Sequence, residues 1–166
     1  MEDPLTPSGC TNLKLRQLGR VVARHYDAHL AATGLKTTQY GLLSGIVKLG
    51  PVRPGELARA MKLDASTLTR NLQPLVDRGW VVLGPGDDAR SRLVSATDAG
   101  RTKRIEAQRA WKRAQLALNK RLGEARVAHL HALLDDCLER LDDEAAVNEV
   151  RPPHAVRPLP PAGARL

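Results

Sequence analysis

Residues 51–97, which read PVRPGELARAMKLDASTLTRNLQPLVDRGWVVLGPGDDARSRLVSAT, decide the fold of this chain. Apolar residues recur at helical spacing over 54–62 and again over 65–78, and Asp64 between the two runs is a typical N-cap. Two short apolar runs then flank the turn sequence Gly84–Asp88, which is typical of a β-hairpin. This order of two helices and a hairpin predicts a winged helix-turn-helix.

The composition favours a mainly α protein with a small β-hairpin wing. The 166 residues include no phenylalanine, and only 2% are aromatic, so leucine, valine and alanine must fill the core. Such side chains favour packing of helix on helix. The formal net charge of +8 points to a polyanionic partner, and nucleic acid is favoured over a membrane surface.

Helical periodicity continues on both sides of the winged segment. We expect an N-terminal helix over 11–32, capped by Thr11 or Asn12 and ended by Gly34, and a second helix from about 37 to 49. Two more helices are expected between 99 and 146, with Cys137 on the apolar stripe of the last one and therefore buried.

These patterns divide the chain into three parts. A loose arm is expected over 1–10 and a Pro-rich disordered tail over 148–166, on either side of one domain over 11–147. Within that domain the winged helix-turn-helix takes about 37–97.

The helix over 65–78 carries the residue types that read DNA. The major groove admits one α-helix, whose N-terminal side chains reach the base edges. Arg70 suits guanine and Asn71 suits adenine. In the hairpin, Arg90 and Arg92 are placed to contact phosphates or a minor groove, with Asp88 bridging to Arg90. The full set of predicted DNA-binding residues is Ser66, Thr67, Thr69, Arg70, Asn71, Asp88, Arg90 and Arg92.

Three segments resemble the MarR-type (multiple antibiotic resistance) regulators. They are LKTTQYGLLSGI (35–46), ELARAMKLDASTLTRNLQPLVDRGWV (56–81) and DARSRLVSATDAGR (88–101), and the resemblance covers about residues 11–145. It implies a homodimer whose first and last helices, 11–32 and 99–146, interleave below two winged lobes. It also implies a repressor that covers a palindromic operator on double-stranded DNA and is released by a small ligand or by thiol oxidation.

Two residues depart from the pattern of that family. Pro74 lies inside the predicted recognition helix, where it removes one backbone hydrogen bond and is expected to kink or shorten the helix. Arg53 precedes the helix over 54–62, where serine or threonine would be a better cap.

The resemblance places sensor sites where the dimer helices meet the winged lobe, and two alternatives follow. In the first, Arg16 or Arg20 clamps the carboxylate of a small aromatic acid while His25 and Tyr40 line the pocket. In the second, Cys10 is a redox sensor, because a helix N-terminus near Lys14 and Arg16 favours the thiolate. Tyr26 or Tyr40 would then bind the sulfur. The aromatic acid is the preferred effector because it is the commoner mode in the family.

Other classes of protein are disfavoured by what the sequence contains. Cys10 and His25 would lie roughly 22 Å apart along one helix, and no phosphate loop or paired carboxylates appear, so we expect no enzyme and no cofactor. Cys10, His25 and His29 would converge on a metal only if the arm folded back, so no metal is expected. No apolar run is long enough for a membrane span and no leader is recognisable, so the expected location is cytoplasmic. A winged helix that contacts protein, or that coats DNA without sequence preference, remains the alternative.

Overall fold

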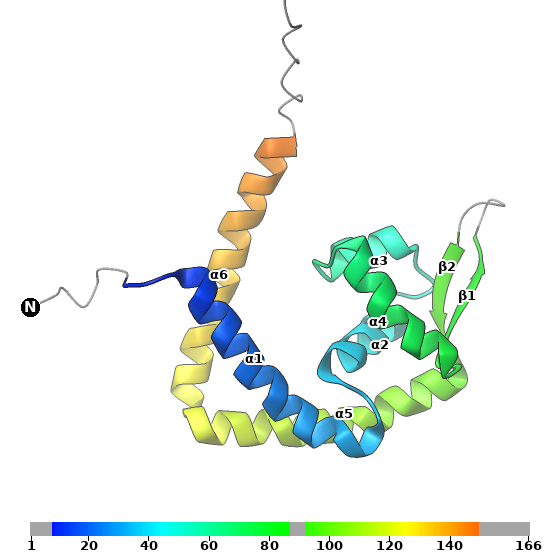
Figure 1. Ribbon diagram of the computed structural model, residues 1–166, viewed down its shortest axis with the longest axis horizontal. Coiled ribbons are helices and arrows are strands. Elements are labelled where there is room, and N and C mark those ends of the chain that lie inside the picture. Colours follow the sequence, from blue (N-terminus) through cyan, green and yellow to red (C-terminus); the bar gives the residue numbers. More distant parts are fainter. Residues whose placement is uncertain (1–7, 87–91, 150–166) are drawn as a thin grey trace, which may run out of the picture. The chain divides into compact units, whose positions relative to one another are not determined.

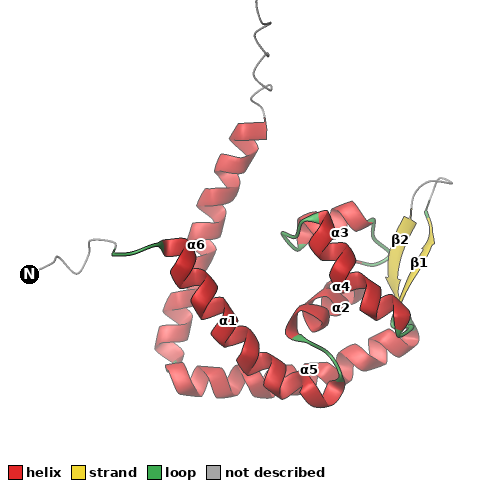
Figure 2. Cartoon of the chain, in the orientation of Figure 1, coloured by secondary structure: helices red, strands yellow, loops and turns green. Residues whose placement is uncertain are grey.

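The computed structural model describes residues 8–86 and 92–149, with side chains through residue 141. It is mainly helical with one antiparallel hairpin (Figures 1 and 2), as the sequence predicts. Contacts divide the chain into a unit over Met1–Arg121 and a unit over Leu122–Leu166, which are described separately. The elements in chain order are α1 (Thr11–Leu30), the short 3-10 helix η1 (Ala31–Thr33), α2 (Thr37–Leu49), α3 (Pro54–Ala60), α4 (Ala65–Asp77), β1 (Val81–Pro85), β2 (Arg92–Ala96), α5 (Asp98–Leu122) and α6 (Glu124–Glu149).

Local signals place both ends of α1 within a residue or two of their predicted positions. The residue that caps its start is Cys10, without a side-chain cap hydrogen bond, so the expected capping by Thr11 or Asn12 is wrong. At the other end η1 adds one tight turn, and Gly34 follows it with a φ of +72°. Glycine takes this left-handed conformation at little steric cost, which is why it ends the helical segment.

The pair α3 and α4 forms the predicted helix-turn-helix. Pro54 takes the first turn of α3, which its restricted φ suits, although Arg53 before it provides no side-chain cap. Asp64 caps α4 by accepting a hydrogen bond from the backbone N–H of Thr67. The sequence predicts that Pro74 kinks or shortens this helix. The helix runs through Pro74 to Asp77, so the predicted shortening is wrong.

Hydrogen bonds, in addition to the chain connections, attach the hairpin to the helices. β1 and β2 pair antiparallel, with Val81 opposite Ala96 and Pro85 opposite Arg92. Val52, in the link between α2 and α3, donates to the carbonyl of Val94 at 3.1 Å and accepts from its N–H at 2.9 Å. These two bonds add a one-residue bridge to the edge of β2.

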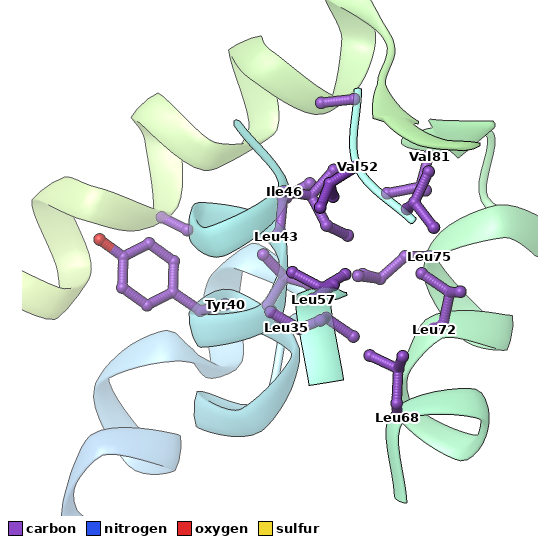
Figure 3. Packing of buried hydrophobic residues seen from close by; sticks show 14 of the residues in the cluster. Leu35, Tyr40, Leu43, Ile46, Val52, Leu57, Leu68, Leu72, Leu75 and Val81 are labelled. Atoms are coloured by element: carbon purple, nitrogen blue, oxygen red, sulfur yellow. The ribbon is translucent and has the colours of Figure 1, made fainter. Parts of the chain in front are cut away.

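One hydrophobic core holds the first unit together. Leucines from α2, α3 and α4 point toward one another, and Val52 and Val81 close the side next to the hairpin (Figure 3). Leu43, Leu57 and Leu75 are fully buried at 0% exposure. Three alanines of α5, Ala107, Ala110 and Ala114, are also buried, and their small side chains leave room for close helix contact. The leucine-rich and alanine-rich core agrees with the composition.

The second unit consists chiefly of α6, which begins after Gly123 with a φ of +86°. Its apolar positions Leu133, Leu138 and Leu141 are exposed. Cys137 is exposed as well, so the prediction that it is buried is wrong for the single chain. Along the described ranges, no helix combines the length and apolarity needed to cross a membrane.

Candidate nucleic-acid interface

The helix α4 has one buried face and one exposed polar face. Leu68, Leu72 and Leu75 point into the core, because they recur at intervals of three and four residues. Residues on the opposite side follow the same spacing and are exposed; these are Ser66, Thr69, Arg70 and Gln73. The exposed face therefore presents hydroxyl, guanidinium and amide groups along two turns.

Asp64 organises the start of this face. Its carboxylate accepts hydrogen bonds from the Ser66 hydroxyl at 2.6 Å, the Thr67 backbone N–H at 2.7 Å and the Thr67 hydroxyl at 2.7 Å. These bonds, the one from the Ser66 side chain first, hold the pKa of Asp64 well below its usual range. Both hydroxyl protons are used within the protein, so Ser66 and Thr67 offer acceptor oxygens rather than donors toward solvent.

The next two predicted contact residues are also engaged internally. The Thr69 hydroxyl donates to the carbonyl of Ala65 at 2.8 Å, and the Asn71 amide donates to the carbonyl of Thr67 at 2.9 Å. Asn71 is half-buried, whereas Arg70 is exposed. Within the described part of the chain, the Arg70 guanidinium has no hydrogen-bond or ion-pair partner. Arg70 is thus the donor on this face that is best placed for an external acceptor.

Gln73 also belongs to this face, although its residue type alone did not predict a DNA contact. Its amide donates to the Asp77 carboxylate at 2.7 Å, which leaves the side-chain carbonyl as an acceptor. The signal that would have found it is its spacing, since Gln73 follows Ser66 by seven residues and Arg70 by three.

Arg92 is the part of the predicted wing contact that the structure describes. It is exposed at the start of β2, opposite Pro85 at the end of β1. Asp88 and Arg90 lie outside the described residues.

The predicted sensor region contains a cluster of aromatic side chains. The ring of Trp111 on α5 lies 6.3 Å from that of Tyr26 on α1 and 6.2 Å from that of Tyr40 on α2. The Tyr26 hydroxyl donates to the side chain of Gln115, and burial raises the pKa of this tyrosine. His25 donates from Nε2 to the carbonyl of Ala114 at 2.8 Å. His25 and Tyr40 therefore border one cluster formed by α1, α2 and α5.

The other predicted sensor residues are not part of that cluster. Arg16 and Arg20 are exposed on α1. At about 100° per residue, they point roughly 180° and 140° away from His25 around the helix axis. Cys10 is exposed at the N-cap, far along the helix from His25. Within one chain, the structure thus joins His25 and Tyr40 but not Arg16, Arg20 or Cys10.

Comparison with known proteins relates this geometry to a family. Residues 33–91 match the model of the MarR family. The HTH-type transcriptional regulator YwoH of Bacillus subtilis is 30% identical over 84 residues, which are 51% of this chain and 61% of that protein. The chain thus aligns with less than two thirds of this curated relative.

Two solved structures in complex with DNA have the same fold. A MarR variant from E. coli bound to operator DNA is 26% identical, with a TM-score of 0.69 over 76% of this chain and 92% of that one. The M. tuberculosis regulator MosR bound to DNA is 28% identical, with a TM-score of 0.63 over 78% and 98% of the two chains. The winged helix-turn-helix of this chain thus resembles that of the MarR family, whose model matches residues 33–91.

Proposed function

We propose that the protein is a homodimeric transcriptional repressor that binds a palindromic operator through α4 and the hairpin. The observation that carries this proposal is the exposed face of α4. Arg70 projects from the N-terminal half of this helix, whose start is already capped by Asp64. The DNA complexes of the E. coli and M. tuberculosis proteins support the assignment by similarity.

Exposed apolar side chains support the dimer. Leu15 and Leu18 on α1 are 50% and 40% exposed, and they continue the stripe that buries Tyr26 and Leu30 farther along the same helix. Contiguous apolar surface of this kind marks interaction sites in soluble proteins. A second copy of the chain would cover it, in agreement with the symmetry of a palindromic operator.

The test is fluorescence anisotropy with a duplex from the promoter upstream of the protein's own gene. If Arg70 contacts a base, Arg70→Ala should cost about 1–3 kcal/mol and relax the preference at one base pair. Arg92→Ala should weaken binding about equally for all sequences and lower the salt dependence, because phosphate contacts release counterions.

Arg16→Ala is the matched control, since it removes another exposed arginine, from α1. It should leave DNA binding unchanged when no effector is present. Equal affinity of wild type, Arg70→Ala and Arg92→Ala would overturn the interface. Absence of any DNA binding with an intact fold would favour a protein-contact role for the winged helix.

For the switch, we propose a small aromatic acid that binds beside Tyr40, Trp111 and His25. The supporting observation is that aromatic rings of three helices gather there, with the polar groups of His25 and Gln115 at the edge. Arg16 and Arg20 point away from His25 in the same chain, so a guanidinium clamp from either one requires the second protomer.

Oxidation of Cys10 is the second candidate for the signal that releases the protein from DNA. The thiol is exposed at the N-cap of α1, where an oxidant can reach it. A hydroperoxide would convert the thiolate to a sulfenate, with the peroxide reduced to an alcohol.

A release assay separates the two modes of switching. The DNA complex is treated with benzoate-type acids or with cumene hydroperoxide, in wild type and in Cys10→Ser. Release by an acid in both proteins supports the ligand. Release by the peroxide alone, lost in Cys10→Ser, supports oxidation and rejects the ligand. Tyr40→Ala should weaken only the acid response.

A further inference from the structure

Two histidines of α1 form a close pair beside the aromatic cluster. His25 and His29 are one helical turn apart, and their ring centroids are separated by 4.6 Å with a tilt of 51°. Both side chains are half-buried. The remaining described histidines, His129 and His131, are exposed on α6.

Hydrogen bonds fix which nitrogen of each ring carries the proton. His25 Nε2 lies 2.8 Å from the carbonyl of Ala114, and His29 Nδ1 lies 2.9 Å from the carbonyl of His25. A carbonyl oxygen only accepts, so both of these nitrogens must donate. In the neutral rings, His25 Nδ1 and His29 Nε2 then keep their lone pairs.

Both rings make the kind of backbone bond that is seen in metal-ligating histidines. A ligating histidine commonly donates its other ring N–H to a backbone carbonyl, which fixes the tautomer and orients the ring. When both nitrogens lie 2.0–2.1 Å from one metal ion, the ring centres are roughly 4.5–5.3 Å apart for bond angles of about 90–110°. The observed separation of 4.6 Å falls within that range.

We propose that His25 and His29 chelate a divalent transition-metal ion of borderline softness, such as Ni²⁺ or Zn²⁺, through His25 Nδ1 and His29 Nε2. Imidazole suits these ions, whereas Mg²⁺ and Ca²⁺ require oxygen ligands. This inference goes beyond the proposed regulator and does not depend on it.

The site has two protein ligands, and exchangeable water completes the coordination. Among the described residues, no group of three or more His, Cys, Asp or Glu side chains is placed to hold a metal. Asp27 lies between the two histidines in sequence, and its Oδ1 accepts hydrogen bonds from the backbone N–H and the hydroxyl of Thr37, each at 2.7 Å. An open two-histidine site predicts reversible binding.

The test is a titration of the untagged, full-length, reduced protein with Ni²⁺ alone, followed by calorimetry. We expect one strong site per chain in wild type. His29→Gln should weaken that site at least about tenfold, because it removes one ligand while the bond from His25 to Ala114 stays in place. His25→Gln should have the same effect. Circular dichroism confirms that each variant is folded.

The matched control removes the two histidines of α6. The double variant His129→Ala, His131→Ala should keep the strong site, and so should Cys10→Ser. His154 is retained in every protein. Strong binding that disappears with the α6 variant, or that survives in both His25→Gln and His29→Gln, would overturn the proposal.

Nitrogen-15 spectra of the imidazole rings provide an independent measurement, with diamagnetic Zn²⁺ as the probe. The proposal requires the resonances of His25 Nδ1 and His29 Nε2 to shift on addition of Zn²⁺. The nitrogens that donate to the carbonyls should change little. Unchanged resonances of both rings at saturating Zn²⁺ would contradict the site even if metal binds elsewhere.

Discussion

The carbonyl oxygen of Trp80 lies 2.0 Å from the position that a Cβ atom on Gly100 would take. The two residues join the end of the helix-turn-helix to the first turn of α5, where the backbone N–H of Thr97 also donates to the Trp80 carbonyl at 3.1 Å. A side chain at position 100 therefore meets backbone, which cannot move aside as a flexible side chain can.

We predict that Gly100→Ala destabilises the fold by about 1–3 kcal/mol or more, because α5 must shift away from Trp80. Urea unfolding at fixed chain concentration measures the loss. Gly55→Ala is the control, since no atom lies within 4 Å of its Cβ position and its helix gains up to about 1 kcal/mol from alanine. Equal stabilities of the two variants would show that α5 accommodates the methyl group.

Leu75 connects α4 to the core, and its side chain is fully buried. Leu75→Ala should lower the free energy of unfolding by about 2–5 kcal/mol, through lost burial and the cavity that remains. Leu83→Ala is a matched leucine deletion at an exposed position of β1, and it should cost much less. A similar loss for both leucines, measured by urea unfolding, would mean that Leu83 is covered in the assembled protein.

The carboxylate of Asp64 predicts a stability change with pH. Hydrogen bonds from Ser66 and Thr67 lower its pKa in the folded state from the ordinary value of 3.8. The folded protein therefore binds this proton less readily than the unfolded chain. The stabilisation is complete above about pH 5 and is lost as the pH falls below about 4.

Asp64→Asn isolates this contribution, because asparagine caps helices well but carries no charge. Thermal midpoints from pH 7 to pH 2 should show wild type more stable than the variant near neutrality. The difference should shrink toward acid as the aspartate becomes neutral. A difference that stays constant with pH would indicate that the charge does not contribute to the cap.

Arg78 joins the end of α4 to the loop after α1. Its guanidinium donates to the carbonyl of Gly34 at 2.7 Å and lies 5.1 Å from the ring centre of Trp80. Arg78→Ala should cost about 1 kcal/mol, from the lost hydrogen bond and cation–π contact, and should alter the Trp80 fluorescence. Arg59→Ala, on the exposed surface of α3, is the control and should change stability by less than about 0.5 kcal/mol. If both arginine variants unfold alike, the Arg78 contacts contribute no measurable stability.

The sequence predicted features that depend on near neighbours. The cap at Asp64 and the glycine after η1 follow from the chemistry of one turn, so their residue types were sufficient. The spacing of leucines in α4 likewise predicted its buried side. The identity of the α1 cap was missed because Thr11, Asn12 and Cys10 differ by only one or two positions, and no side-chain cap bond marks the true start.

Features that depend on distant contacts could not be predicted in this way. The bonds of His25 to Ala114 and of Tyr26 to Gln115 each span 89 residues, and no local pattern specifies them. Arg16 and Arg20 were grouped with His25 because the family resemblance places sensor sites where the first helix meets the winged lobe, but their angular positions around the helix axis separate them from His25. The internal hydrogen bonds of Ser66 and Asn71 also required side-chain geometry.

The two hydrogen bonds between Val52 and Val94 link the hairpin mechanically to the segment before α3. A rotation of α3 would therefore pull on Val52 and, through these two bonds, on β2. In the proposed dimer, each protomer would present its winged segment to DNA as one rigid body. Adjustment to DNA would then come from the relative position of the two protomers rather than from a change within either winged segment.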